Sequence, residues 1–297
     1  MHVFDRRAVR AHRDRAAAGL DGHDFLLREV GDRLADRLLD VRRSFPVALD
    51  LGCHRGELGR LLGGRGGIET LIQCDLSERM LGAAAGLRLV ADEEWLPLAD
   101  HSVDLVVSLL ALHWVNDLPG TLIQIRRALR PDGLLLAVMF GGRTLSELRH
   151  ALGEAEVAGE GGLSPRISPF ADVRDIGNLL QRAGFALPTV DTETLTVSYA
   201  DPLRLMSDLR GMGESNAVCE RRKSLSRRTT LLDAAARYRV LYGDAHGRVP
   251  ATFQLIYLTA WSPGRDQPRP LRPGAATARL ADALEAREIP AGERAAP

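Results

Sequence analysis

The stretch Val47-Ala48-Leu49-Asp50-Leu51-Gly52-Cys53-His54-Arg55-Gly56 runs a short apolar strand into an acid and a glycine turn. A second strand, Thr70-Leu71-Ile72-Gln73-Cys74-Asp75, ends in a carboxylate 19 residues beyond Gly56. An acid at this distance suits the two hydroxyls of an adenosine ribose, because it ends the next strand of a nucleotide-binding fold. Together the two segments predict a site for a nucleoside cofactor.

The turn also indicates which cofactor the site binds. A dinucleotide site requires the spacing G-x-G-x-x-G, so that the backbone can approach a pyrophosphate at a helix N-terminus. Counted from Gly52, the second and third glycine positions hold His54 and Glu57, whose bulk and charge disfavour a pyrophosphate. S-adenosylmethionine has no phosphate and carries two cationic groups, so the carboxylate of Asp50 favours its binding. We therefore predict an S-adenosylmethionine site, with a purely structural turn as the alternative.

Further strands follow at the spacing of a doubly wound sheet. Residues 89–97 predict a third strand that ends in acids, and residues 102–108 predict an apolar fourth strand. A helix over 118–129 and a turn at 130–133 precede a fifth strand over 134–140. Apolar strands are typical of a parallel sheet covered on both faces, whose ligands bind at the carboxyl ends of the strands. The residues predicted to bind the cofactor are Asp50, Gly52, Cys53, Gly56, Asp75, Leu76, Asp92, Glu93 and Leu109.

Later segments complete the predicted architecture. Residues 194–199 and 251–258 alternate like strands, and about 50 residues of mostly helical pattern separate them, which is too long for a plain hairpin loop. The predicted fold is therefore α/β, a doubly wound and mostly parallel Rossmann-like sheet with a helical insertion before the last strand. Residues 1–262 form the predicted cofactor-binding domain, and residues 200–250 form its insertion or lid. Residues 263–297, rich in Pro, Gly, Arg and Ala, predict a disordered tail.

Composition excludes several classes of protein. The chain has 297 residues and 45% hydrophobic content, enough to fill a sizeable core. Its 39 basic and 39 acidic residues balance, which disfavours a general nucleic-acid binder or an anionic-membrane binder. No apolar run reaches the roughly 18 residues of a membrane span. Acids at Asp5, Asp14 and Asp21 count against a transit peptide, and three cysteines without a C-x-x-C pair favour a reducing cytoplasm and no structural zinc.

Several segments resemble a known superfamily. Pro-Leu-Ala-Asp-His-Ser-Val-Asp at 97–104 and Arg-Pro-Asp-Gly at 130–133 resemble the class I S-adenosylmethionine-dependent methyltransferases. Ser-Leu-Leu-Ala-Leu-His-Trp-Val-Asn-Asp-Leu-Pro at 108–119 and Met-Gly-Glu-Ser-Asn at 212–216 narrow the resemblance to the fifth assembly factor of respiratory complex I, an arginine hydroxylase family, and its bacterial relatives. Met-Phe-Gly-Gly at 139–142 and the segment 163–170 agree. The resemblance covers residues 4–261.

The resemblance implies a methyltransferase fold that binds S-adenosylmethionine. It implies action on an arginine of a complex I subunit, the small subunit that holds the terminal iron–sulfur cluster, by methylation or hydroxylation. Membrane association is then expected only through complex I. Two positions depart from the family pattern. His54 stands at a glycine position, although histidine tolerates positive φ, and Arg143 stands where an acid is expected.

His113, Trp114 and Glu214 are the candidate catalytic residues. His113 and Trp114 follow the fourth strand, where a base beside a flat apolar wall suits a guanidinium that stacks on the indole. Glu214 follows two glycines and is suited to pair with a substrate arginine. The alternatives are that Trp114 packs under the following helix and that Glu214 lies in a solvated loop. No His, Asp or Glu group shows the ligand spacing of an iron site, so the sequence supplies no mechanism of oxygen activation.

Three other polar segments have structural and functional interpretations. Asn116 and Asp117 are expected to cap the helix that begins at Leu118. The segment 164–168 is expected to be a stiff connector, with a lid as the alternative. The basic run at 221–228 is expected to be a solvated helix face, with a docking patch for a protein partner as the alternative.

Three functions remain open at the level of the sequence. The first is an S-adenosylmethionine-dependent enzyme that modifies a protein arginine during complex I assembly. The second is O-methylation of a carrier-bound malonyl group in biotin synthesis, and the segments around Trp114 and Glu214 favour the first. The third is a non-catalytic assembly chaperone, which exposed apolar residues near the insertion and an occluded cofactor cleft would favour.

Overall fold

The computed structural model describes residues 2–265, 267–268 and 279–287. One compact unit ends at Gly264, and the residues from Arg265 onward form a second unit. The second unit contains the one-turn helix α10 (Leu280–Ala283), and the other parts of the predicted tail, at 266, 269–278 and 288–297, lie outside the described residues. No helix in the described ranges has both the length and the apolar character that crossing a bilayer requires.

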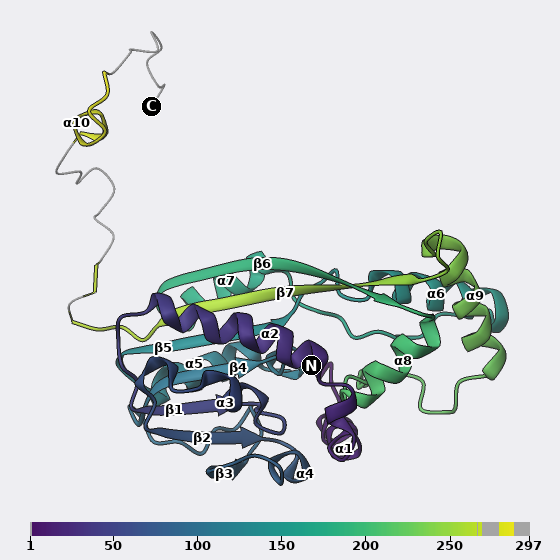
Figure 1. Ribbon diagram of the computed structural model, residues 1–297, viewed down its shortest axis with the longest axis horizontal. Coiled ribbons are helices and arrows are strands. Elements are labelled where there is room, and N and C mark those ends of the chain that lie inside the picture. The colour runs from purple at the N-terminus through teal and green to yellow at the C-terminus, as the bar shows by residue number, and fades with distance from the viewer. Residues whose placement is uncertain (1, 266, 269–278, 288–297) are drawn as a thin grey trace. The chain divides into compact units, whose positions relative to one another are not determined.

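A seven-stranded sheet forms the centre of the first unit, in the order β3-β2-β1-β4-β5-β7-β6 (Figure 1). Strands β1 to β5 pair in parallel, whereas β7 is antiparallel to both of its neighbours. The predicted doubly wound, mostly parallel sheet is confirmed. The strands are β1 (Val47–Leu51), β2 (Thr70–Asp75), β3 (Leu87–Val90), β4 (Val103–Leu109), β5 (Leu129–Phe140), β6 (Ala186–Tyr199) and β7 (Val249–Trp261).

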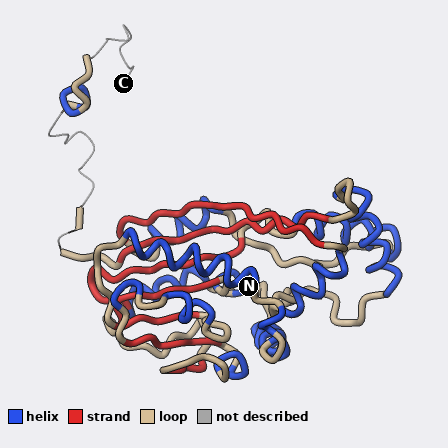
Figure 2. Tube along the Cα trace, viewed as in Figure 1, coloured by secondary structure: helices blue, strands red, loops and turns tan. Residues whose placement is uncertain are grey.

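Helices cover both faces of the sheet, as Figure 2 shows. The side chains of β5 alternate between the faces, with Leu134 and Leu136 in one buried cluster and Leu135 and Ala137 in the other. The first cluster includes residues of α2, α3 and α6, and the second includes residues of α5 and α7. The helices of this unit are α1 (Arg6–Ala16), α2 (Phe25–Asp36), α3 (Glu57–Leu62), α4 (Glu78–Leu81), α5 (Leu118–Ala128), α6 (Ser146–Glu160), α7 (Val173–Arg182), α8 (Pro202–Gly211) and α9 (Arg228–Tyr242).

The last two strands extend beyond the rest of the sheet. Phe140, the last residue of β5, pairs with Leu255, whereas β6 and β7 remain paired as far as Tyr199 and Val249. This two-stranded ribbon projects past the carboxyl end of β5 and carries α8 and α9 at its far end (Figure 1). Residues 200–248 therefore lie on the side of the carboxyl ends of the parallel strands.

Two parts of the fold differ from the sequence-based prediction. The turn expected at 130–133 lies inside β5, where Asp132 has a φ of +61° and the pairing with β4 shifts between Val103 and Leu105. The chain makes its turn there as an irregularity within a strand rather than between elements. Residues 6–16, in which no helix was predicted, form α1, which Asp5 caps by accepting a hydrogen bond from the Ala8 amide.

Candidate functional site

A glycine turn joins β1 to α3 at the carboxyl edge of the sheet. Gly52 has a φ of +71°, and a side chain there would overlap that of Ala111, just beyond β4. His54 takes a φ of +52°, and its Nε2 atom lies 3.0 Å from the Leu109 carbonyl oxygen at the end of β4. Histidine at this position therefore adopts the backbone that a glycine would adopt, and its ring ties the turn to the neighbouring strand.

Asp50, near the end of β1, is a buried acid without a hydrogen-bond partner. Its side chain is fully buried, and within the described residues neither carboxylate oxygen accepts a hydrogen bond. Burial, with repulsion from Glu57 and Asp75, raises the pKa of Asp50 to about 8, although the Gly59 amide acts in the opposite direction. A buried carboxyl group of this kind is expected to have a hydrogen-bonding or cationic partner in the functional state.

Asp75, at the end of β2, is by contrast saturated with donors. Its Oδ1 atom accepts a hydrogen bond from the Ser77 amide at 2.8 Å. Its Oδ2 atom accepts one from the His54 amide at 3.0 Å and one from the Arg13 guanidinium at 3.1 Å. The carboxylate predicted to hold a ribose is thus bound by groups of this chain.

Helix α1 supplies two arginines to the acids at the ends of β2 and β3. Arg13 is only 2% exposed and also donates to Glu93 at 2.9 Å. Arg6 donates to Asp92 at 2.6 Å and pairs with Glu93. Burial alone would raise the pKa of Glu93, but the two guanidinium groups hold it well below its usual value. Asp75, Asp92 and Glu93 with Arg6 and Arg13 therefore form one closed ionic cluster, which we call the acid cluster.

Sequence analysis did not identify Arg6 or Arg13 as site residues. Both lie on a stripe at helical spacing with Val9 and Ala16, and three of these four positions are buried. A helical stripe in which arginine takes an apolar position indicates a buried acidic partner. That signal is present in the sequence, but the N-terminal segment was interpreted only with respect to a transit peptide.

The residues before α1 are fixed to the loop that follows β4. Asn116 accepts hydrogen bonds from the Val3 and Phe4 amides at 2.8 and 2.7 Å. The Phe4 ring contacts the Trp114 ring edge to face, with centroids 5.4 Å apart. The expectation that Asn116 caps a helix is wrong, whereas Asp117 does cap α5 through the Gly120 amide.

The structure brings the three candidate catalytic residues together. Glu214 accepts hydrogen bonds at 3.0 Å from His113 Nε2 and from Trp114 Nε1. Burial would raise the pKa of Glu214, but His113, with further help from Arg13 and Trp114, holds it below its usual value. Residues separated by 100 positions in sequence thus form one hydrogen-bonded group around an ionised carboxylate.

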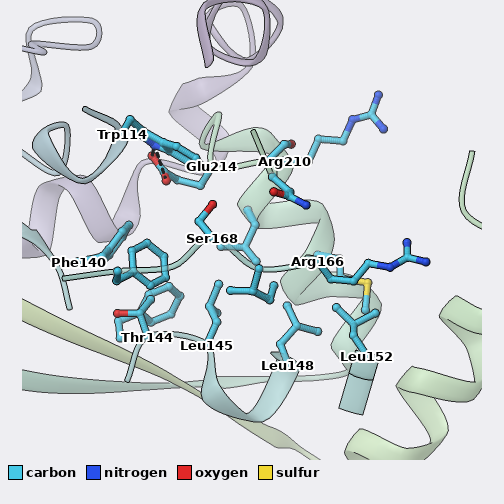
Figure 3. Close-up of a pocket in the computed structure, with 17 residues that line it drawn as sticks. Trp114, Phe140, Thr144, Leu145, Leu148, Leu152, Arg166, Ser168, Arg210 and Glu214 are labelled. Atoms are coloured by element: carbon cyan, nitrogen blue, oxygen red, sulfur yellow. Dashed lines mark hydrogen bonds between the residues drawn. The ribbon is translucent and has the colours of Figure 1, made fainter. Parts of the chain in front are cut away.

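A pocket of about 260 Å³ lies beside this group (Figure 3). Glu214 and Trp114 form part of its wall, Phe140 and Thr144 lie at the end of β5, and Arg166 and Arg210 lie on the opposite side. The remaining lining residues are Leu145, Leu148, Leu152, Ile167, Ser168, Phe170, Met206, Leu209, Ser215, Asn216 and Phe253. Most of the wall is apolar or aromatic, with few polar groups, as in small-molecule and side-chain pockets generally.

His113 lies behind the pocket rather than in its wall. Its side chain is fully buried, and its ring packs against Phe140 with centroids 4.7 Å apart and against Phe170 at 5.8 Å. It is not among the residues that line the pocket. His113 can therefore act on a bound group only through residues that do line the pocket, by its hydrogen bond to Glu214 and by its packing against Phe140 and Phe170.

The other predicted site residues fall into two groups. Gly52, Cys53, Gly56, Leu76 and Leu109 lie at or just beyond the ends of β1, β2 and β4. In the segment 164–168, Arg166, Ile167 and Ser168 line the pocket. Arg143 is exposed, away from the pocket lining. The described part of the chain contains no group of three His, Cys, Asp or Glu side chains arranged to hold a metal ion.

Comparisons with known proteins agree with this geometry. The model of a methyltransferase domain family matches residues 49–137, which contain most of β1, all of β2 to β4 and most of β5. The arginine-hydroxylase NDUFAF5, mitochondrial, of Danio rerio is 45% identical over 289 residues, covering 95% of this chain and 89% of its own length. The malonyl-[acyl-carrier protein] O-methyltransferase of Gallionella capsiferriformans is 34% identical, covering 92% and 96%.

Solved structures show the same fold at low sequence identity. The phosphoethanolamine N-methyltransferase 2 of Haemonchus contortus, in complex with S-adenosyl-L-methionine, superposes with a TM-score of 0.54 at 16% identity. The match covers 86% of this chain and 60% of that one. Given the strand order and the full-length similarity to the Danio rerio protein, this chain belongs to the methyltransferase family that contains the NDUFAF5 arginine hydroxylases.

Proposed function

We propose that this protein binds S-adenosylmethionine and modifies an arginine side chain of a respiratory complex I subunit during assembly. The observation that carries the proposal is Glu214, an ionised acid in the wall of an aromatic pocket next to the acid cluster. The relatives named as arginine hydroxylases support a protein arginine as substrate. The iron–sulfur subunit remains the specific candidate, and the predicted cytoplasmic location stays a prediction because these relatives are named mitochondrial.

The strand ends fit the proposed cofactor. Asp50 offers a buried carboxyl group without a partner, which suits the cationic groups of S-adenosylmethionine. Asp75 and Glu93 offer oxygens for hydroxyl and amino groups, once Arg13 releases them. We therefore propose that cofactor binding replaces the contacts that Arg13 makes, and that Arg6 stays on Asp92 at the rim of the site.

The pocket fits a guanidinium. Glu214 can accept two N–H bonds from a planar guanidinium, and such charge-assisted pairs are among the stronger hydrogen bonds of proteins. Trp114 and Phe140 offer aromatic surface for the flat group. When bound, S-adenosylmethionine supplies an electrophilic methyl group. Glu214, oriented by His113 and Trp114, accepts the proton that a guanidinium nitrogen would lose on methylation, and the same contacts would orient the group for hydroxylation.

A mass measurement tests this function. The purified protein and S-adenosylmethionine are incubated with the candidate iron–sulfur subunit, and the tryptic peptides of the subunit are weighed. A gain of one methylene mass indicates methylation, and a gain of one oxygen in a parallel incubation supplied with dioxygen and a reductant indicates hydroxylation. The Glu214→Gln variant should give neither product. Absence of any product and of any binding of the subunit by the native protein would refute the proposal.

A chaperone without catalytic activity is the second candidate, and two observations favour it. Arg6 and Arg13 occupy the acid cluster, and apolar side chains near the insertion are exposed, namely Leu163, Leu225, Val240 and Leu241. The same incubation separates the two functions, because a chaperone would bind the subunit and leave the mass of its peptides unchanged. Modification of a malonyl carrier protein instead of the subunit would support O-methyltransferase activity, the activity named for the second set of relatives.

A further inference from the structure

A second hollow, of about 460 Å³, lies next to the pocket and shares Leu152, Arg166, Met206, Arg210 and Asn216 with it. The hollow is basic. Its lining includes four arginines and one histidine, and no aspartate or glutamate lines it: His12, Arg166, Arg210, Arg221 and Arg222 are the basic residues. Asn216, Ser224 and Ser226 add polar side chains. Because the whole chain is neutral, this local excess of positive charge is a feature of the surface and not of the composition.

The basic run predicted from the sequence contributes to this hollow, though not as a helix face. Residues 219–227 form a loop before α9, so the predicted helical face is wrong. Arg221 is held by Asp5 at 3.0 Å, and Arg222 is held by Glu160. Their guanidinium groups are thus fixed in orientation by carboxylates that do not themselves line the hollow.

Arg210 and Arg15 are different, because neither has an acidic partner within ion-pair distance among the described residues. Both are exposed, and both line a third hollow, of about 230 Å³, together with His23 and Ser207. Burial and the charge of Arg210 lower the pKa of Arg15. Two like charges side by side repel each other, and an anion bound between them would relieve that repulsion.

Arg210 belongs to all three cavities: the pocket with Glu214, the basic hollow and the hollow with Arg15. The cationic groups therefore line two separate hollows that share Arg210, rather than one point. A single phosphate would need them to converge, whereas a chain that carries carboxylates at several positions would contact them one after another. We call this set of residues, namely Arg15, Arg210, Arg221 and Arg222, the basic rim.

We propose that the basic rim binds an acidic segment of the protein substrate, with aspartate or glutamate side chains on one or both sides of the residue that enters the pocket. This inference rests on the proposed function and names the kind of sequence that the site selects. The rim supplies charge complementarity outside the pocket, where it attracts the segment and fixes its register, while Glu214 binds the central group. Exposed charge pairs are individually weak, so selection is expected to depend on several of them together.

Peptide binding tests the rim separately from the pocket. Four fluorescein-labelled peptides are compared by anisotropy with the full chain. Two carry a central arginine, flanked either by four aspartates or by four asparagines, and two carry citrulline in place of that arginine. The acidic peptide with arginine should bind about tenfold more tightly than its asparagine counterpart, and added salt should reduce the difference.

Charge reversal at the two unpaired arginines provides the variant. Arg15→Glu with Arg210→Glu should abolish the preference for aspartate, whereas Arg42→Glu with Arg182→Glu should preserve it. Arg42 and Arg182 are also exposed, but they lie outside the lining of the three cavities. All four positions are exposed, so folding should not decide the result, and melting temperatures confirm this.

The possible outcomes distinguish the two proposals. Equal binding of the aspartate and asparagine peptides, no binding of either, or an undiminished preference in the Arg15/Arg210 variant would overturn the rim proposal. If the arginine and citrulline peptides bind equally, the proposed function of the pocket is contradicted. A preference for aspartate in the same experiment would still support the proposal for the basic rim. Binding of 4′-phosphopantetheine by the native protein but not by the Arg15/Arg210 variant, together with no binding of the acidic peptide, would assign the rim to a phosphate and overturn the proposal of an acidic peptide.

Discussion

The acids in the two halves of the carboxyl edge of the sheet have different partners. At the ends of β2 and β3, Asp75 and Glu93 are closed off by Arg13, a guanidinium from the same chain. Beyond β4 and β5, Glu214 is held by ring nitrogens of His113 and Trp114 and still forms part of a pocket wall. A buried acid in direct contact with an arginine has little left for a ligand, whereas an acid held by two ring nitrogens at the wall of a pocket can still accept hydrogen bonds from one.

Helix α1 links the two halves. Arg13 points into the acid cluster, while His12 contacts the Ser215 carbonyl oxygen at 3.0 Å, next to Glu214. A movement of α1 that released Asp75 would therefore also disturb the loop that carries Glu214. We therefore predict that cofactor binding and substrate binding are coupled through α1. Each of the following variants changes a residue in one part of the carboxyl edge.

The largest effect is expected at Glu214 in the open half. Glu214→Gln should lower turnover by about 10²–10⁴-fold if the carboxylate accepts the substrate proton. Turnover is measured by mass on the subunit peptides. His113→Ala should lower turnover less and shift the pH profile of turnover, since His113 bonds to Glu214 and does not itself line the pocket. Glu220→Gln, an exposed acid of the same loop, is the matched control. Normal turnover in Glu214→Gln would remove the catalytic assignment.

The next effect concerns the closed half. Arg13→Met leaves Asp75 and Glu93 buried with fewer partners, so it should lower the free energy of unfolding by about 3–5 kcal/mol in urea titrations. Because the same change removes the group that competes for these acids, affinity for S-adenosylmethionine should be unchanged or higher by calorimetry. The exposed Arg7→Met, on the same helix, should change stability by only about 0.5 kcal/mol. A large loss of affinity would mean that Arg13 binds the cofactor and does not yield to it.

Substitution of Asp75 is expected to have a smaller effect than substitution of Arg13 and to change the affinity for S-adenosylmethionine in the opposite direction. Asp75→Asn should weaken S-adenosylmethionine binding by about 10–100-fold, because a hydrogen bond to a charged group contributes about 1.5–3 kcal/mol. Isothermal titration measures the affinity, and the exposed Asp100→Asn serves as the control. Unchanged affinity would exclude a ribose contact and would indicate that Asp75 serves only to anchor Arg13.

Most of the sheet and the strand-end acids were predictable from sequence, because both depend on local pattern. Apolar runs gave the positions of β1, β2 and β4, and the acids at the ends of β1 and β2 necessarily meet at one edge of a parallel sheet. The spacing of Asp50 and Asp75 needed no tertiary information.

Contacts made across long separations could not be predicted in the same way. The pairing of Arg13 with Asp75 joins residues 62 positions apart, and nothing in either segment specifies the other. The position of Glu214 depends on the length of the β6–β7 ribbon, which alternation alone underestimated because β6 begins at Ala186 and not near Thr194. His113 was assigned to the pocket from its place after β4, but its rotamer directs the ring between Phe140 and Phe170.

The smallest expected effect is a change in the protonation of Asp50, which belongs to neither half of the carboxyl edge. The pKa of Asp50 in the folded protein, about 8, lies above its usual value of 3.8, so the folded state keeps a proton that the unfolded chain loses. Asp50 therefore favours folding at low pH, and this contribution is lost as pH rises from about 4 to above 8. A cationic cofactor beside the carboxyl group would favour its ionised form and release that proton on binding.

Calorimetry of S-adenosylmethionine binding at pH 7, in buffers of different ionisation enthalpy, measures the proton directly. We expect release of up to about one proton per cofactor, and affinity that rises as pH increases towards 8, because the proton must leave before the charge can form. Asp50→Asn should bind more weakly, with no release. If the native protein takes up or releases no proton, the buried carboxyl group does not face the cationic part of the cofactor, and the orientation of the cofactor along the strand ends must be reversed.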